Sequence, residues 1–457
     1  MRFRRCPATV WRVAFLGHAE SDHRTGQRDS PHRRGMRCRV PELFACWRSS
    51  RVGTDEIAVQ PKDMMNTRFT RAIKLFRRGT VVLLVASLSY LSLSVSVSQV
   101  SAVTTTESTR TSDWLAAQIG ADGAVNVAGE TSSTTTQTMY VAEGLAASGQ
   151  HRDALARAMG YLALHVNDWV VDDSTFTLAP IGSDLPGRLS YLILLVHTVG
   201  GDPASFGSPA TNLVARLQAL YGVSSPGFYG VQEPYTAVFD QSLVVMALLS
   251  SGNTPPNAAV QWIVDQQCMG GSNPAGSLGG WQALRATVGS ALVDCDTPDP
   301  MSYAGPDTND TAIAMQALVA AGRTTEIRSA LTFLHAAQAT SGVMAGGFPF
   351  ITGGGPDSNS TALVIQAIVA AGQSPTGGAW SIGSSSPVSI LTTWQVTTPG
   401  QDLGAFSYQA GMSPDLMSTY QALWGLTLTA FPFPVLPIVL PAESMRDAPA
   451  AVPTFTG

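Results

Sequence analysis

Residues 306–322 read PDTNDTAIAMQALVAAG, and residues 356–372 read PDSNSTALVIQAIVAAG. The second stretch repeats the first after 50 residues. A repeat of this length that contains an apolar run indicates stacked units that bury one another's faces. Between Thr311 and Ala321 only Gln316 is strongly polar, which predicts a helix buried on every side.

Glycines at one kind of position place further helices in the chain. An apolar run ends at a glycine, the residue that tolerates positive φ, at Gly149, Gly200, Gly252, Gly322 and Gly372. The predicted buried helices are 131–148, 186–199, 237–251, 310–321, 360–371 and 416–429. Runs with apolar residues at i, i+3, i+4 and i+7 alternate with them and predict amphipathic helices near 112–119, 151–166, 208–221, 256–267, 324–338 and 387–395.

Six buried and six amphipathic helices in alternation predict an all-α fold, an α6/α6 toroid with an inner ring wrapped by an outer ring. The first outer helix precedes every inner one, so it packs beside the last repeat and closes the circle. A wider spacing marks an insertion, Gly270 to Tyr303. This insertion includes most of the residues between Cys268 and Cys295. In an exported chain we expect these two cysteines to form a disulfide.

The chain before the repeats has two parts of different character. Residues 1–63 hold twelve arginines and no sustained apolar period, and we interpret them as an untranslated or disordered extension. Residues 64–102 join a basic stretch to the apolar run 81–97 and end in small residues, which predicts a signal peptide cleaved after Ala102. If residues 1–63 are translated, the apolar run becomes an internal anchor instead. The sequence otherwise predicts a secreted or cell-envelope protein with a toroid at 103–430 and a Pro-rich tail at 431–457.

The charge of the predicted mature chain limits its partners. From Val103 onward it holds nine arginines, no lysine and 25 acidic residues, a net charge of −16. Such a surface repels phosphate backbones and anionic headgroups. We therefore expect neither nucleic-acid binding nor strong membrane association after signal cleavage.

The outer helices share an ending. An aromatic or aliphatic pair is followed by Gln and then, in three cases, by a Gly-aromatic or Gly-Ala-aromatic step: Trp114-Leu115 with Gln118; Trp262-Ile263 with Gln267 and Gly279-Gly280-Trp281; Phe333-Leu334 with Gln338 and Gly346-Gly347-Phe348; Ile390-Leu391 with Gln395 and Gly404-Ala405-Phe406. This pattern resembles the Gln-Trp repeat of the prenyltransferase and squalene-cyclase superfamily, over most of residues 112–429. The resemblance implies the closed toroid of that superfamily and a structural role for the glutamines.

At residues 307–311 the sequence differs from the catalytic motif of the cyclases in this superfamily. Their Asp-x-Asp-Asp-Thr delivers a proton from the central Asp, whereas residues 307–311 read Asp-Thr-Asn-Asp-Thr. The acid's position is thus Asn309, and an amide supplies no proton near neutral pH. A cyclase would need Asp310 or Asp307 to act as the acid, so we expect no catalysis from this motif.

No cofactor or metal is predicted. The prenyltransferases of the superfamily hold zinc with Asp, Cys and His, but His151, His165, His197 and His335 all lie far from Cys295 in the chain. The resemblance is nearer to non-catalytic exported toroids such as the transcobalamin-type carriers. Their C-terminal β domain has no counterpart here.

The candidate site is one mouth of the toroid. All inner helices of such a ring start at the same end, and aromatic and polar side chains precede or open each one. The predicted ligand-binding residues are Tyr229, Tyr235, Asp240, Trp281, Tyr303, Asp307, Asn309, Asp310, Phe348, Asp357, Asn359, Tyr408 and Asp415. A simpler interpretation remains open, in which the acids are helix N-caps and the aromatics fill the ring.

Three functions follow from these observations. The favoured one is a binding module for an unidentified small molecule, glycan or peptide. The alternatives are a terpenoid cyclase-like enzyme with a degenerate motif and a scaffold that presents its rim to a protein.

Overall fold

The computed structural model describes residues 105–172, 177–289 and 291–439. The predicted extension at 1–63, the signal peptide and its cleavage site lie outside this range, as do residues 440–457 of the predicted tail.

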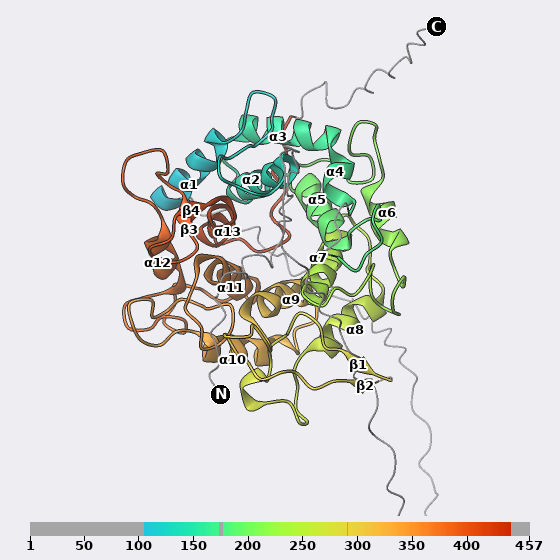
Figure 1. Ribbon diagram of the computed structural model, residues 1–457, viewed down its shortest axis with the longest axis vertical. Helices are drawn as coiled ribbons and strands as arrows, with labels where there is room; N and C mark the ends of the chain where they lie inside the picture. The colour runs from blue at the N-terminus through green and yellow to red at the C-terminus, as the bar shows by residue number, and fades with distance from the viewer. Residues whose placement is uncertain (1–104, 173–176, 290, 440–457) are drawn as a thin grey trace, which may run out of the picture. The chain divides into compact units, whose positions relative to one another are not determined.

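Six helices form a closed inner ring (Figure 1). They are α2 (Thr134–Ser148), α5 (Pro186–Thr198), α7 (Ala237–Ser250), α9 (Thr308–Ala320), α11 (Ser358–Ala370) and α13 (Leu416–Leu426). Each packs against the next in this order, and α13 packs against α2. The predicted α6/α6 toroid is confirmed, because the packing returns to its starting helix.

The outer helices lie against this ring. They are α1 (Thr106–Ala117), α3 (Arg152–Leu164), α6 (Leu213–Ala219), α8 (Asn257–Gln266), α10 (Ile327–Ala337) and α12 (Pro387–Leu391). As predicted, α1 packs against both α2 and α13 and so bridges the first and last repeats. The predicted helix 208–221 is shorter in the structure, because Pro209 lies in a turn and the Asn212 side chain caps α6 by accepting from Ala215 N at 2.8 Å.

Short elements fill the connections. They are the one-turn helix α4 (Val166–Val170), the 3₁₀ turns η1 (Ala275–Ser277) and η2 (Thr392–Trp394), and two hairpins. In the first hairpin β1 (Thr287–Val288) pairs with β2 (Ala291–Leu292). In the second, β3 (Phe406–Ser407) pairs with β4 (Pro414–Asp415), with Phe406 opposite Asp415. All four strands are antiparallel to their partners.

The Asp-x-x-x-Thr pattern at the start of inner helices has a structural explanation. The aspartate is the N-cap: Asp307 and Asp357 each accept a backbone hydrogen bond across 2.7 Å from the third residue of their helices. The threonine accepts a second bond from the Gly-aromatic loop, from Trp281 N to Thr311 and from Phe348 N to Thr361, both at 3.0 Å. The motif therefore fixes the preceding loop on the helix start.

The repeated glutamines join neighbouring repeats. Gln267 donates to the carbonyl of Glu326 at 3.2 Å, and Gln338 donates to the carbonyl of Trp380 at 2.7 Å. Each contact runs from the end of one outer helix to the segment that leads into the next. The structural role implied by the resemblance is thus what these side chains perform.

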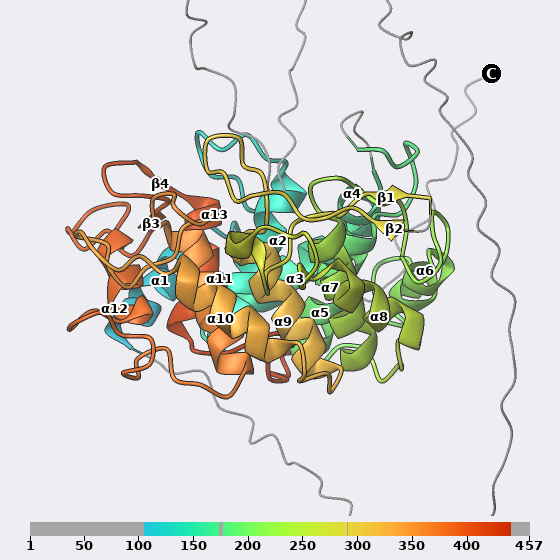
Figure 2. The ribbon, with the colours of Figure 1, turned by 90° about the horizontal axis from the view of Figure 1, so that it is seen from below.

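Residues 429–439 form a strap across one end of the ring, at the C-terminal halves of the inner helices (Figure 2). Phe431 N donates to Gln316 Oε1 at 2.9 Å, and Ile438 N donates to the carbonyl of Val199 at 3.1 Å. Phe431 and Phe433 are each only 5% exposed. Two buried phenylalanines therefore anchor the first part of the segment predicted as a Pro-rich tail to the ring.

The predicted disulfide between Cys268 and Cys295 is present, with the Cα atoms 5.9 Å apart. It ties the end of α8 to the far side of the insertion. Across the described ranges, the helices are too short or too polar to cross a membrane.

Candidate functional site

Two regions of the ring hold the polar and aromatic side chains that could bind a ligand. One is the end at which the inner helices start, which we call the rim. Neighbouring helix starts are bonded to each other's loops there, from Thr308 N to the carbonyl of Phe350 at 2.9 Å and from Ser358 N to the carbonyl of Tyr408 at 3.0 Å. The second region, described below, is the inside of the ring.

At the rim, three tyrosine side chains reach solvent, near the starts of α7, α9 and α11. Tyr303 is 62% exposed, has a φ of 56°, and its ring centroid lies 6.3 Å from that of the half-buried Phe350. The half-buried Tyr408 donates a hydrogen bond to Asp357. Tyr235, which is 68% exposed, stands before α7. The predicted aromatic mouth thus has exposed members, and a positive φ at a bulky residue is typical of sites where surrounding structure imposes strain.

Three predicted aromatic site residues do not reach solvent. Trp281 and Phe348 have no exposed surface, and Tyr229 is 2% exposed. The Trp281 indole donates to the carbonyl of Ile263 on outer helix α8, at 2.7 Å. These three rings are therefore buried and not exposed at the mouth, and a ligand contact for them stays a prediction.

Four of the predicted polar residues serve the helix starts. Asp307, Asp357 and Asp415 are N-caps, and the hydroxyl of Ser358 donates to Asn359 Oδ1 at 3.0 Å. Burial raises the pKa of Asp357 to about 7, although hydrogen bonds from Ser360 and Tyr408 oppose this shift. The simpler interpretation holds for these acids, because capping accounts for their positions. Asn309, 6% exposed, occupies the second position of α9.

Asp310 differs from the capping acids. Its carboxyl group is fully buried beside that of Asp307, and neither oxygen has another hydrogen-bond partner among the described residues. Burial and the negative charge of Asp307 raise its pKa well above the usual range. Asp240, near the start of the adjacent α7, has a pKa raised to about 7 by burial, and Thr236 donates to it at 2.8 Å. Burial and the neighbouring acid thus both favour the neutral form of the Asp310 carboxyl group.

Inside the ring lies a continuous series of aromatic side chains that the sequence analysis did not single out. We call it the aromatic belt, and it comprises Phe239 (α7), Tyr191 (α5), Phe431 (strap), Trp424 and Tyr420 (α13), and Tyr140 (α2). Successive ring centroids are 6.5, 6.3, 5.1, 4.9 and 4.6 Å apart in that order. All six residues are at most 5% exposed. The belt therefore joins α7 and α5 to α13 through the strap, and joins α2 to α13 directly.

Polar atoms without partners gather around the belt. Four buried polar atoms have no hydrogen bond within the described residues. They are the hydroxyl of Tyr191, the indole N–H of Trp424, Nε2 of Gln316 and Oε1 of Gln366. Gln316 and Gln366 otherwise hold the strap, through Phe431 N and the carbonyl of Thr429. Leaving a buried polar group unpaired costs roughly 1–3 kcal/mol, so four such atoms in one region require an explanation.

Glu143 lies one turn after Tyr140 on α2 and is 4% exposed. Burial raises its pKa well above the usual range. Its charge acts to raise the pKa values of Tyr191 and Tyr420. The Tyr420 ring stacks on that of Tyr140, which lies one turn before Glu143 on α2. Among the described residues no cation pairs with it.

These inner residues were missed because an apolar helix does not reveal which face points into the ring. The available signal was a single polar residue in an apolar run. Glu143 within 139–147, Gln316 within 311–321 and Gln366 within 361–371 all have this property. Such a residue is buried with its helix and must therefore meet the ring interior or a partner helix.

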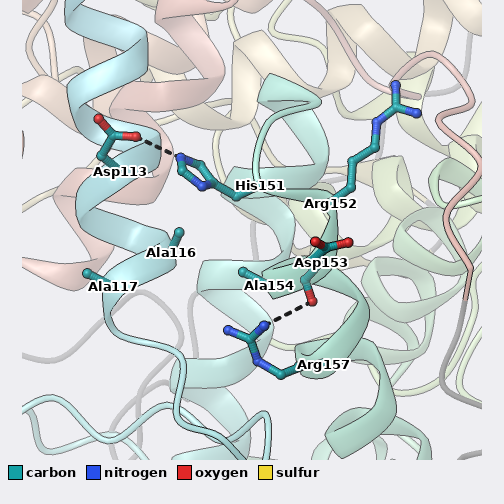
Figure 3. A pocket seen from close by; sticks show the side chains of 8 residues that line it. All are labelled: Asp113, Ala116, Ala117, His151, Arg152, Asp153, Ala154 and Arg157. Atoms are coloured by element: carbon teal, nitrogen blue, oxygen red, sulfur yellow. Dashed lines mark hydrogen bonds and ion pairs between the residues drawn. The ribbon is translucent and has the colours of Figure 1, made fainter.

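The outer surface has an open groove between α1 and α3, and none of the residues of the aromatic belt line it (Figure 3). Its ion pair joins His151 to Asp113 at 2.7 Å, and Arg157 donates to the backbone carbonyl of Asp153. Both histidine and aspartate are well exposed to solvent, so the pair adds little stability. In the described part of the chain, no three His, Cys, Asp or Glu side chains are placed to hold a metal ion.

Comparisons with known proteins concern the fold alone. No family model matches the chain, and no curated protein matches it in sequence. An unsaturated glucuronyl hydrolase specific for heparin is similar in structure, with 13% identity, a TM-score of 0.49, and coverage of 70% of this chain and 95% of that one. Protein geranylgeranyltransferase-I of Candida albicans is also similar, with 13% identity, a TM-score of 0.45, and coverage of 75% and 97%.

A third similar structure is the type II terpene cyclase MstE from Scytonema, with 12% identity, a TM-score of 0.44, and coverage of 70% and 96%. The class of protein is defined by the helix packing itself. This chain is an all-α protein built as a toroid of six inner and six outer helices.

Proposed function

We propose that this protein, once exported, binds a small molecule inside its inner ring and acts as a binding module. The observation that carries the proposal is the group of four buried polar atoms around the aromatic belt that have no partner among the described residues. A structure that bears this cost at one place is favoured if a ligand supplies the missing hydrogen bonds.

The surroundings of these atoms match a binding pocket in composition. Aromatic walls with a few convergent polar groups are typical of small-molecule sites. The strap closes one end of the ring with Phe431 and Phe433, so the ligand enters from the rim. The exposed Tyr303 and Tyr235 stand at that entrance.

Native mass spectrometry of the full chain, purified from the cells that produce it, tests this function. We expect a co-purifying mass on the wild-type protein and its loss in Tyr191→Phe, which removes one unpaired hydroxyl group. Tyr161→Phe, on outer helix α3 and away from the belt, is the matched control and keeps the adduct. A bare wild-type chain, or an adduct that Tyr191→Phe retains unchanged, contradicts the proposal.

A second function is favoured by Asp310 alone. A buried carboxyl group whose neutral form is favoured is able to protonate an alkene, and this residue, with Asp307 beside it, would then be the acid of an isoprenoid cyclisation. The test is to incubate the full chain with squalene and to look for a cyclic product, with the Asp310→Asn variant as the control. A cyclic product that is lost in the variant establishes catalysis. Unchanged squalene removes this candidate and leaves the binding module.

A further inference from the structure

The chemical class of the ligand follows from the surroundings of Glu143, and this step rests on the proposed function. Glu143 is a buried residue on α2, and no cation among the described residues forms an ion pair with its carboxyl group. A buried carboxylate is costly unless a positive charge accompanies it. The ring supplies no such charge at this point.

What surrounds Glu143 is aromatic. Tyr140 lies one turn before it on the same helix, and the Tyr140 ring stacks on Tyr420 with centroids 4.6 Å apart. Tyr191 on α5 is near enough for the Glu143 charge to raise its pKa. The electron-rich faces of aromatic rings attract cations, and several rings with one carboxylate form the usual cage for an organic ammonium group.

We propose that the ring interior binds an organic monocation, with Glu143 as its counter-ion and the tyrosines of the aromatic belt as its walls. The nearby Trp424 belongs to the same wall, since its ring lies 4.9 Å from that of Tyr420. The unpaired Tyr191 hydroxyl and Gln366 Oε1 are available to polar groups elsewhere on the ligand. A neutral molecule of the same shape leaves Glu143 without a partner and binds more weakly.

Protonation links this binding to pH. In the empty ring burial favours the neutral carboxyl group, whereas a bound cation favours the carboxylate, so binding releases a proton. The affinity therefore rises with pH, by up to tenfold per unit, until the pH exceeds the pKa of Glu143 in the empty protein. The titratable groups that face Glu143 are Tyr140, Tyr191 and Tyr420, whose pKa values are all raised, so they stay neutral throughout this range. Farther groups are Arg188 and Glu130, which act on Tyr140, and Asp240, which acts on Tyr191.

The test is a calorimetric titration of the full chain at pH 6, 7 and 8 with two ammonium probes, choline and benzyltrimethylammonium. The neutral carbon isostere of choline, 3,3-dimethyl-1-butanol, is the matched ligand. We expect at least one ammonium probe to bind, choline at least tenfold tighter than its isostere, and an affinity that increases with pH. Glu143→Gln should lower the affinity for the cation at least tenfold and abolish its pH dependence. Asp265→Asn, an exposed acid-to-amide change on outer helix α8, should leave both unchanged.

Each other result overturns the inference in a distinguishable way. If the isostere binds as tightly as choline, or if Glu143→Gln binds the cation as well as the wild type, the ring binds small molecules but not as a cation site. If neither ammonium probe binds, the cation inference is wrong, and the co-purifying mass described above still decides the proposed function on its own.

Discussion

The side chain of Gln395 donates a hydrogen bond to the backbone carbonyl of Glu107 across 2.8 Å. A second bond, also of 2.8 Å, runs from the same amide group to the hydroxyl of Thr111. These contacts join the last repeat to α1 and so close the outer ring. They repeat, at the junction of the chain's two ends, what Gln267 does between α8 and α10.

Replacing Gln395 should weaken this closure. Gln395→Leu keeps the side-chain volume but removes both of these hydrogen bonds, and the Glu107 carbonyl then keeps the Thr111 hydroxyl as its side-chain donor at 3.0 Å. We expect a loss of roughly 1–3 kcal/mol in the free energy of unfolding. Gln401→Leu, on an exposed loop of the same repeat, is the control and should change the free energy by less than about 0.5 kcal/mol. Urea denaturation measures both. Equal stability of the two variants contradicts the role given to Gln395.

The strap should be part of the cooperative unit. Phe431→Ala removes a ring that contacts Tyr191, Trp424 and Phe433, and truncation of a buried phenylalanine costs about 3–5 kcal/mol. Val435→Ala lies in the same strap but is 40% exposed, and it should cost far less. Thermal unfolding compares the two. If Phe431→Ala unfolds at the wild-type temperature, the strap does not stabilise the ring.

The pKa of Asp357 predicts a pH dependence of stability. This pKa is about 7 in the folded chain against a usual value of 3.8, so between these values the folded state binds the extra proton. The stability is therefore greatest below about pH 4 for this group and falls as the pH rises to about 7, by about 4 kcal/mol at most. Asp357→Asn keeps a capping oxygen for Ser360 N but does not ionise, so the fall should be shallower.

Denaturation curves at pH 4, 5, 6, 7 and 8 measure this slope for the wild type and the variant. Asp402→Asn replaces an exposed acid and serves as the control. If Asp357→Asn leaves the slope of the free energy of unfolding against pH unaltered, other titratable groups cause the pH dependence.

The disulfide should protect the insertion more than the ring. Because Cys268 and Cys295 are 27 residues apart, the chain-entropy model assigns the bond about 2–4 kcal/mol. Without it, Cys295 N keeps only the hydrogen bond to Asn273 Oδ1, so the loop opens first. The double variant Cys268→Ser/Cys295→Ser should be cut by trypsin at Arg285 well before the wild type. Equal cleavage rates contradict this prediction.

The sequence predicted the ring because fully buried helices and half-buried helices have different patterns of apolar residues, and these patterns are visible in the residue types. Glycines at helix ends located five inner helices and an apolar run located the sixth, all to within a few residues. Gly149 and Gly372 indeed have φ values of 68° and 72°. It did not predict which aromatic residues would meet across the ring. Tyr191 and Phe431 are 240 residues apart in the chain, and their contact depends on the path of the strap, which no local pattern encodes.

The same reason explains the error over Trp281 and Phe348. Their place directly before an inner helix is visible in the sequence. The burial of each ring also depends on how its loop is bonded to the helix start, through Thr311 or Thr361, which residue types alone do not reveal. The acids at 307, 357 and 415 were assigned both a capping and a binding role. Their hydrogen bonds support the first, and a ligand contact for them stays a prediction.

The most direct test of the account is the stability of ligand-free Tyr191→Phe against the ligand-free wild type, by urea denaturation. If the Tyr191 hydroxyl awaits a ligand inside the ring, its removal relieves an unpaired buried group, and the variant is more stable by roughly 1–3 kcal/mol while binding ligand more weakly. If the variant is less stable than the wild type, the hydroxyl already has its partner, and the ring interior is a packed core and not a binding site.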